Sequence, residues 1–208
     1  MQYKWLNKQN NKNLIVFFNG WGMDENIVNN LDSENYDVLT FFDYRTFEVP
    51  NIDFSKYEKK YLIAWSMGVF VCNYFYEKLE KFNRYIAING TLKPIDDDFG
   101  IPIKAYNLTI DNFNELTCSK FMKKISSVID LKNYCTRNIE ELKQELIAIR
   151  DLQLNKFFNF NKAIISKNDR IFPYKNMLSF WENTNASITE LDASHYIFDK
   201  YNKWSDLI

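Results

Sequence analysis

The chain has 208 residues, 26 basic and 27 acidic side chains, a formal net charge of −1 and 46% hydrophobic residues. This composition excludes a disordered chain, and the balanced charge excludes binding to nucleic acid or to an anionic membrane through an overall field. The three cysteines fit no metal-binding spacing and cannot all pair, which predicts reduced thiols and a cytoplasmic location. The polar first residues predict neither a secretory signal nor a membrane anchor. We further expect a monomer.

Continuous apolar runs predict four strands in the first part of the chain, at residues 13–19, 36–44, 59–66 and 83–90. A short helix is expected around residues 25–31, and a second helix begins at Met67. Apolar strands that alternate with helices are typical of a parallel sheet covered on both faces. The sequence therefore predicts an α/β fold.

The pattern changes at about residue 91, where strong strand signals stop. Residues 114–131 and 137–154 have helical periodicity with many charges. After them, residues 161–173 and 186–195 each predict a strand followed by a loop, residues 174–183 predict a helix, and a helical tail is expected from Tyr196. We therefore predict a single domain over residues 1–208, with a helical lid insertion at about 91–155. Such an insertion typically lies over the carboxyl ends of the strands, where ligands bind in open α/β sheets.

Ser66 stands where the third predicted strand passes directly into a helix, within the sequence AWSMG. This arrangement is typical of a nucleophile elbow, a sharp turn that projects a serine hydroxyl above the sheet edge. The usual pattern is G-x-S-x-G; here Ala64 takes the first glycine position and Gly68 the second. The alternative is a buried serine that hydrogen-bonds its own strand.

A serine nucleophile needs a base, and His195 is the one histidine of the chain. It follows the last predicted strand, as the serine–acid–histidine order of this fold requires. Asp169 follows the preceding strand and is the acid expected to orient the imidazole. Weaker alternatives are a turn-forming role for Asp169, and Asp192, Asp199, Asp97 or Asp98 as the acid.

An oxyanion hole requires two main-chain N–H donors. Met67 follows the predicted nucleophile, and Trp21 lies in the glycine-containing loop NGWG after the first strong strand. A phosphate-binding loop is disfavoured because neither G-x-G-x-x-G nor a Walker lysine is present. Trp21 and Trp65 flank the predicted site and are candidates to line an apolar substrate channel, with core packing as the alternative. Together these parts predict an α/β-hydrolase with a mostly parallel central sheet.

Four blocks carry a more specific likeness: FFNGWGMDE, AWSMGVF, AINGTLKPIDDDFGIP and DASHYIF. They resemble the BioG family of pimeloyl-acyl-carrier-protein methyl ester esterases, and the likeness extends over essentially the whole chain. The resemblance implies a Ser66–Asp169–His195 triad, oxyanion amides from Trp21 and Met67, and no cofactor. It also implies a substrate, the methyl ester of a pimeloyl group carried on acyl carrier protein, that is hydrolysed for biotin synthesis.

An acidic carrier protein needs a basic docking patch. The strongest candidates are Lys120, Lys123 and Lys124, in the predicted insertion. Further candidates there are Lys104, Arg137, Lys143 and Arg150. The alternative is a solvated helix face with local ion pairs, because Glu140, Glu141, Glu145 and Asp151 are interleaved with the last three.

Two other functions stay open from the sequence. Triad geometry does not define the acyl group, so a broad-specificity carboxylesterase or thioesterase is the first. The second is a non-catalytic binding module built on the same fold, although such a module needs no complete set of catalytic side chains.

Overall fold

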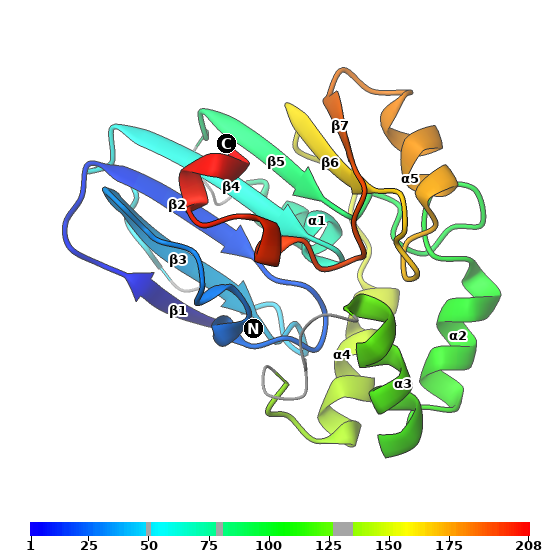
Figure 1. The fold of residues 1–208 in the computed structure, drawn as a ribbon. Coiled ribbons are helices and arrows are strands. Elements are labelled where there is room, and N and C mark those ends of the chain that lie inside the picture. Colours follow the sequence, from blue (N-terminus) through cyan, green and yellow to red (C-terminus); the bar gives the residue numbers. More distant parts are fainter. Residues whose placement is uncertain (49–50, 78–80, 127–134) are drawn as a thin grey trace.

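A seven-stranded sheet forms the centre of the molecule in the computed structural model, which describes residues 1–48, 51–77, 81–126 and 135–208. The strand order is β1-β3-β2-β4-β5-β6-β7 (Figure 1). The strands are β1 (Gln2–Asn7), β2 (Asn13–Phe18), β3 (Tyr36–Phe42), β4 (Lys59–Trp65), β5 (Arg84–Ile88), β6 (Lys162–Ser166) and β7 (Ser187–Leu191). The predicted α/β class is thereby confirmed.

The strands from β3 to β7 in this order pair in parallel, and β1 joins the edge antiparallel to β3. In β2, residues 14–18 are all buried, as expected for a strand that is covered on both faces. The sequence did not predict β1. Its first half is exposed, so this edge strand lacks the apolar run by which the other strands were found.

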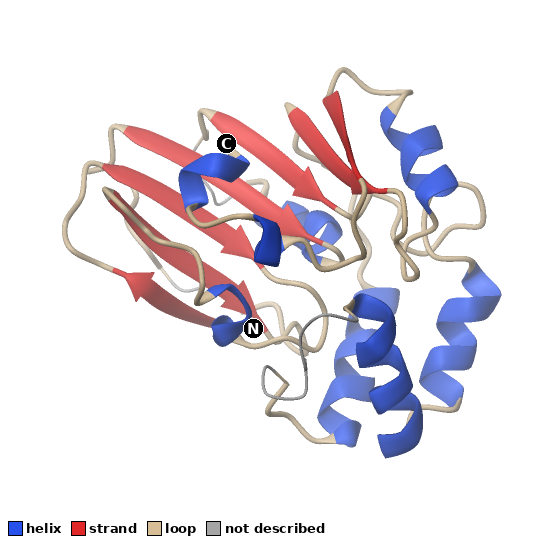
Figure 2. Cartoon of the chain, in the orientation of Figure 1, coloured by secondary structure: helices blue, strands red, loops and turns tan. Residues whose placement is uncertain are grey.

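The two faces of the sheet are covered by different elements. Leu14, Val16 and Phe18 of β2 share one core with α1 (Gly68–Val71), η2 (Cys72–Phe75) and α5 (Tyr174–Trp181). Ile15 and Phe17 face a second core with the short 3₁₀ segments η1 (Glu25–Val28), η4 (Phe198–Lys200) and η5 (Trp204–Leu207). In Figure 2, short helical segments lie in front of the sheet.

Several predicted helices are shorter than expected. The helix after Ser66 is one α-turn followed by the 3₁₀ segment η2, and the expected helical tail consists of η4 and η5. The expected helix at residues 25–31 is the 3₁₀ segment η1. Apolar spacing alone does not separate an α-helix from a succession of tight turns.

Three helices of the insertion lie together beyond the carboxyl ends of β4 and β5 (Figure 1). They are α2 (Ile103–Asp111), α3 (Glu115–Ile125) and α4 (Ile139–Asp151). Helix α2 was not predicted, whereas α3 and α4 begin at capping boxes formed by Asn114 with Thr117 and by Asn138 with Glu141. Residues 127–131 of the helix predicted at 114–131 lie outside the described residues. That this insertion acts as a lid on a single domain stays a prediction.

Each helix in the described parts of the chain is too short or too polar to cross a lipid bilayer.

Candidate active site

Ser66 occupies a sharp turn between β4 and α1. Its backbone is left-handed, with φ of 58°, a conformation that is strained for a residue with a side chain. The turn is tight because the chain passes close to its neighbours: a Cβ on Gly68 would lie 2.4 Å from the Phe18 carbonyl oxygen, and one on Gly90 would lie 2.3 Å from that of Ser66. Only glycine fits at these two positions. Position 64 accepts alanine, whose methyl group is fully buried.

His195 reaches Ser66 from the loop after β7. Its Nε2 lies 2.9 Å from Ser66 Oγ. Two side chains hold the loop by its main chain, since the His195 carbonyl accepts hydrogen bonds from Trp65 Nε1 at 3.1 Å and from Asn89 Nδ2 at 2.8 Å. The imidazole also lies parallel to the Phe172 ring, with the ring centroids 6.1 Å apart. The ring is therefore fixed by packing as well as by polar contacts.

Asp169 completes a hydrogen-bonded row with His195 and Ser66. Its Oδ2 lies 2.6 Å from His195 Nδ1, and its Oδ1 accepts the main-chain N–H groups of Ile171 at 2.7 Å and Phe172 at 2.9 Å. Both carboxylate oxygens are thus oriented. A neutral imidazole satisfies the row by donating from Nδ1 to Asp169 and accepting the Ser66 hydroxyl at Nε2.

Other acids considered from the sequence have different partners. Asp192 accepts a hydrogen bond from Asn168 Nδ2 at 2.6 Å, and Asp97 accepts the N–H of Ile103 at the start of α2 at 3.0 Å. These contacts leave Asp169 as the carboxylate that meets the imidazole.

Trp21 and Met67 line the same cavity as Ser66. Both residues are buried, and within the described residues neither of their main-chain N–H groups has a hydrogen-bond acceptor. Buried main-chain donors are nearly always paired in folded proteins. Two unused donors beside a serine hydroxyl are what the binding of a developing oxyanion requires.

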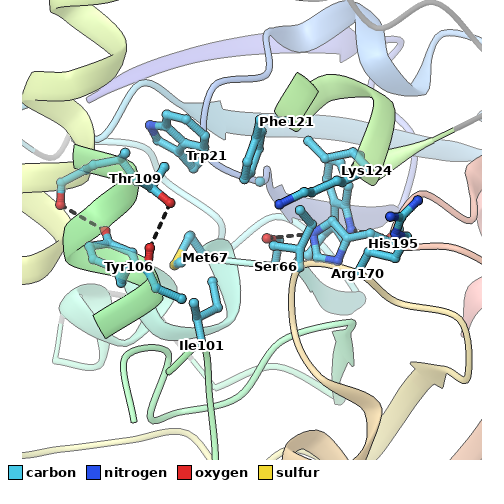
Figure 3. A pocket seen from close by; sticks show the side chains of 16 residues that line it. Trp21, Ser66, Met67, Ile101, Tyr106, Thr109, Phe121, Lys124, Arg170 and His195 are labelled. Carbon is cyan, nitrogen blue, oxygen red and sulfur yellow. Dashed lines mark hydrogen bonds between the residues drawn. The ribbon is translucent and has the colours of Figure 1, made fainter. Parts of the chain in front are cut away.

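The cavity beside Ser66 has a volume of about 100 Å³ and a mainly apolar wall. Trp21 and Trp65 both line it, and Trp21 packs edge-to-face against Phe121 of α3. Figure 3 shows the α2 side chains Tyr106 and Thr109 on the side away from His195. A mainly apolar wall that contains the Ser66 hydroxyl suits an uncharged acyl chain.

A shallow groove of about 380 Å³ continues outward from this cavity between α2 and α3. The two hollows share Ala105, Thr109, Phe121 and Lys124 in their walls. Among the predicted docking lysines, Lys124 lines both hollows and Lys120 lines the outer groove. Lys123 is exposed on α3 and lines neither of these two.

The alternative of a solvated helix face with local ion pairs holds for Arg150 and Asp151 of α4, which pair at 2.8 Å, but not for Arg137 and Glu145. Glu145 is fully buried, and Arg137 forms ion pairs with it at 2.7 Å and with Asp43 at 3.0 Å. Burial raises the pKa of the Glu145 carboxyl, while the Arg137 charge and the N–H of Tyr44 oppose that rise. Arg137 is engaged in the interior and is unsuited to carrier docking.

Other residues of the site escaped the sequence reasoning. Asn89 is fully buried at the end of β5, has φ of 45°, and joins β6 to the His195 loop through its side chain. Arg170 follows Asp169 and lines the cavity (Figure 3). The available signal for Asn89 was its place before Gly90 at a strand end, which also fits an ordinary turn. Among the described residues, no group of side chains suited to metal binding comes together.

Comparisons with known proteins identify the family and the fold. A family model described as pimeloyl-ACP methyl esterase BioG matches residues 1–207. The crystal structure of selenomethionine BioG from Haemophilus influenzae has a TM-score of 0.89 and 31% identity, covering 100% of this chain and 99% of that one. An esterase from Exiguobacterium antarcticum shares the fold, with a TM-score of 0.68 at 16% identity over 95% of this chain and 90% of the esterase.

Two sequence relatives differ in length. An uncharacterised protein of H. influenzae (strain KW20 Rd) is 32% identical over 206 residues, covering 94% of each chain. A Bacteroides fragilis (strain 638R) protein named malonyl-[acyl-carrier protein] O-methyltransferase is 39% identical over 199 residues, 89% of this chain. The match covers 40% of that relative, so this chain spans about two-fifths of its length. On the whole-length family match and the fold, the chain belongs to the BioG family of pimeloyl-ACP methyl esterases, which are carboxylic ester hydrolases of the α/β-hydrolase fold.

Proposed function

We propose that this chain is a serine esterase that hydrolyses the methyl ester of a pimeloyl group carried on acyl carrier protein, releasing methanol. The proposal is carried by one observation: Ser66, His195 and Asp169 form an unbroken hydrogen-bonded row, whose Ser66 and His195 line a mainly apolar cavity. The substrate class follows from family membership. The B. fragilis relative is named malonyl-[acyl-carrier protein] O-methyltransferase. That name also concerns an acyl group on a carrier protein, and it supports a substrate of this class.

In the first half of the reaction, Ser66 Oγ attacks the ester carbonyl as His195 Nε2 takes the hydroxyl proton. The tetrahedral intermediate places its negative oxygen on the N–H groups of Trp21 and Met67, and Asp169 stabilises the imidazolium. His195 then gives its proton to the methoxy oxygen. Methanol leaves, and the acyl chain stays on Ser66 as an ester.

In the second half, water takes the place that methanol left. His195 removes a proton from this water, the resulting hydroxide attacks the acyl-enzyme carbonyl, and the same two N–H groups hold the new oxyanion. Collapse of the intermediate returns the proton to Ser66 Oγ. The product carries a free ω-carboxylate, and no metal or organic cofactor takes part.

The carrier protein docks at the mouth of the α2–α3 groove in this proposal. The groove extends the Ser66 cavity to the surface, so an acyl chain can reach the serine while its carrier stays outside. Lys120 and Lys124 line that groove, and Lys123 is exposed on the same helix. Three lysines on one helix give a positive surface for an acidic partner.

The decisive experiment offers the purified protein pimeloyl methyl ester on acyl carrier protein and follows the mass of the carrier. We expect loss of the methyl group with the thioester left intact, and no reaction for Ser66→Ala. Cleavage of the thioester, releasing free carrier, favours a thioesterase. Faster turnover of short p-nitrophenyl esters favours a broad carboxylesterase. No hydrolysis of any ester indicates a binding module.

A further inference from the structure

The loop of residues 19–23, which holds Trp21, uses almost all of its main-chain donors. Within the described residues, Trp21 N–H is the one donor of this loop that lacks an acceptor. The paired donors and their acceptors are Asn19 N–H with Phe41 O (2.9 Å), Gly20 N–H with Asn19 Oδ1 (2.8 Å), Gly22 N–H with Glu145 Oε2 (3.1 Å) and Met23 N–H with Gly20 O (3.4 Å).

Glu145 is the acceptor among these that comes from the distant helix α4, 123 positions away from Gly22. Its other oxygen, Oε1, accepts the N–H of Tyr44 at 2.8 Å, and the Tyr44 hydroxyl donates to the Asn19 carbonyl at 2.7 Å. The carboxylate therefore holds Gly22 directly and Asn19 through Tyr44. Gly22 has φ of 80°, a left-handed conformation that gives the loop its bend.

Helix α4 holds the Trp21 side chain as well. The indole Nε1 donates to the main-chain carbonyl of Leu142, one turn before Glu145, at 2.9 Å. The two contacts fix Trp21 by its ring and the next residue, Gly22, by its main chain. The orientation of this donor thus depends on α4.

The partners of Glu145 are all donors: two main-chain N–H groups and the Arg137 guanidinium at 2.7 Å. An ionised carboxylate satisfies three donors, whereas an amide of the same shape offers one oxygen and two N–H groups. Arg137 supplies the opposite charge that a fully buried carboxylate requires. A buried ion pair is weak evidence for a gain in stability, so the specific contacts that Glu145 makes are the feature to explain.

We infer that Glu145 is a positioning residue for catalysis. It holds the loop of residues 19–23 in place, so that the Trp21 N–H stays free to bind the oxyanion. This inference rests on the proposed esterase activity of Ser66. It makes α4 part of the rigid frame of the site, because any movement of α4 away from the sheet breaks the Gly22 and Trp21 contacts together.

The test compares Glu145→Gln with a matched change on the same helix, Glu140→Gln, whose side chain is exposed. We expect kcat of Glu145→Gln on a small methyl ester to fall about 10- to 100-fold with KM changed less than about threefold, because the oxyanion forms only after binding. Affinity for a boronic acid, which mimics the tetrahedral intermediate, should fall by a similar factor. Glu140→Gln should behave as the wild type in each assay.

A spectroscopic measurement tests the contact itself. The chain has five glycines, so labelling with ¹⁵N-glycine gives a simple amide spectrum. In the wild type, the Gly22 amide proton should appear at low field, as for a hydrogen bond to a carboxylate, and exchange slowly with solvent. In Glu145→Gln it should move upfield more than the other glycine amides. If the variant does not fold, the chemical shift and the solvent exchange rate of the Gly22 amide proton in the wild type still test the hydrogen bond to Glu145.

Each outcome separates the inference from the function on which it rests. An active wild type with an equally active, folded Glu145→Gln overturns the positioning role alone, as does a rapidly exchanging Gly22 amide at an ordinary shift. Equal losses in substrate and boronate affinity without a fall in kcat also overturn it. A wild type that hydrolyses no ester overturns the proposed function, and the positioning role of Glu145 in catalysis falls with it.

Discussion

His195 Nε2 lies 2.9 Å from Ser66 Oγ, although 129 positions separate the two residues in the chain. The parallel sheet brings them together because the carboxyl ends of β4 and β7 lie on the same side of the sheet. Asn89, directly after β5, one of the two strands between β4 and β7, then binds the His195 carbonyl through its side-chain amide. The contact therefore depends on strand order and on one buried amide, beyond the two residues themselves.

Replacing Ser66 separates catalysis from backbone strain. Both Ser66→Ala and Ser66→Gly should lower kcat by about 10⁴-fold or more, since both remove the nucleophile. Ser66→Gly should be more stable to urea than Ser66→Ala by about 1 kcal/mol, because glycine adopts the positive φ of this turn without strain. An Ala variant that is the more stable of the two argues against a strained elbow.

Asp169→Asn should retain the fold and lower kcat about 10³- to 10⁴-fold, because an amide no longer favours the imidazole tautomer that accepts the Ser66 proton. The control is Asp192→Asn, which alters a contact to Asn168 and leaves the imidazole untouched. Steady-state kinetics on a small ester measure both. Full activity of Asp169→Asn, or an equal loss in the control, contradicts the assignment.

Reversing the charge of a lysine in the α2–α3 groove should lower turnover of the carrier-bound substrate selectively. Lys120→Glu is expected to lower kcat/KM for the carrier-bound ester about tenfold, with a much smaller effect on a free methyl ester, since it repels an acidic partner. The effect should shrink as salt is added. Lys59→Glu, an exposed lysine at the start of β4 and the opposite end of that strand from Ser66, is the matched control. Parallel losses on both substrates remove the docking role.

Filling the groove tests the route of the acyl chain. Ala105 lies in the walls of both hollows, so Ala105→Trp places an indole between α2 and α3. We expect kcat/KM for a pimeloyl ester to fall about tenfold or more, while methyl acetate is hydrolysed at nearly the wild-type rate. Unchanged turnover of the long ester shows that the chain enters elsewhere.

Asp43 gives a prediction for acid stability. Burial works to raise the pKa of its carboxyl, but the hydrogen bonds from Arg45 and the Arg137 charge outweigh this and hold the pKa below its ordinary value. A lowered pKa in the folded state stabilises the fold above the ordinary value of about 4, and that stability is lost as pH falls through the folded pKa. Asp43→Asn should therefore cost about 2 kcal/mol near neutral pH and less near pH 3, measured by urea unfolding. A pH-independent difference contradicts this.

The sequence alone was sufficient to predict those features for which residue type and order along the chain point to the same arrangement. The parallel strands are apolar runs, Ser66 lies between a strand and a helix, and His195 is the one histidine, so few arrangements of these parts were open. Ala64 did not weaken the elbow, because its methyl group is buried at a position where a Cβ fits. Family resemblance then narrowed the substrate, which side-chain order alone left open.

The sequence was insufficient where a residue's meaning depends on tertiary contacts. Glu145 and Arg137 have the charge pattern of a solvated helix, yet they pair in the interior, because their partners Gly22 and Asp43 come from distant loops. Strand β1 is too polar to be recognised by its own pattern and is defined by pairing with β3. Local periodicity holds no information on such long-range partners.

The most direct test of the hydrolytic centre is covalent labelling with a fluorophosphonate, which reacts with an activated serine and needs no knowledge of the acyl group. We predict one label per chain on Ser66, lost in Ser66→Ala and strongly slowed in Asp169→Asn. An unlabelled wild type, or a label that persists when Ser66 is replaced, contradicts the account.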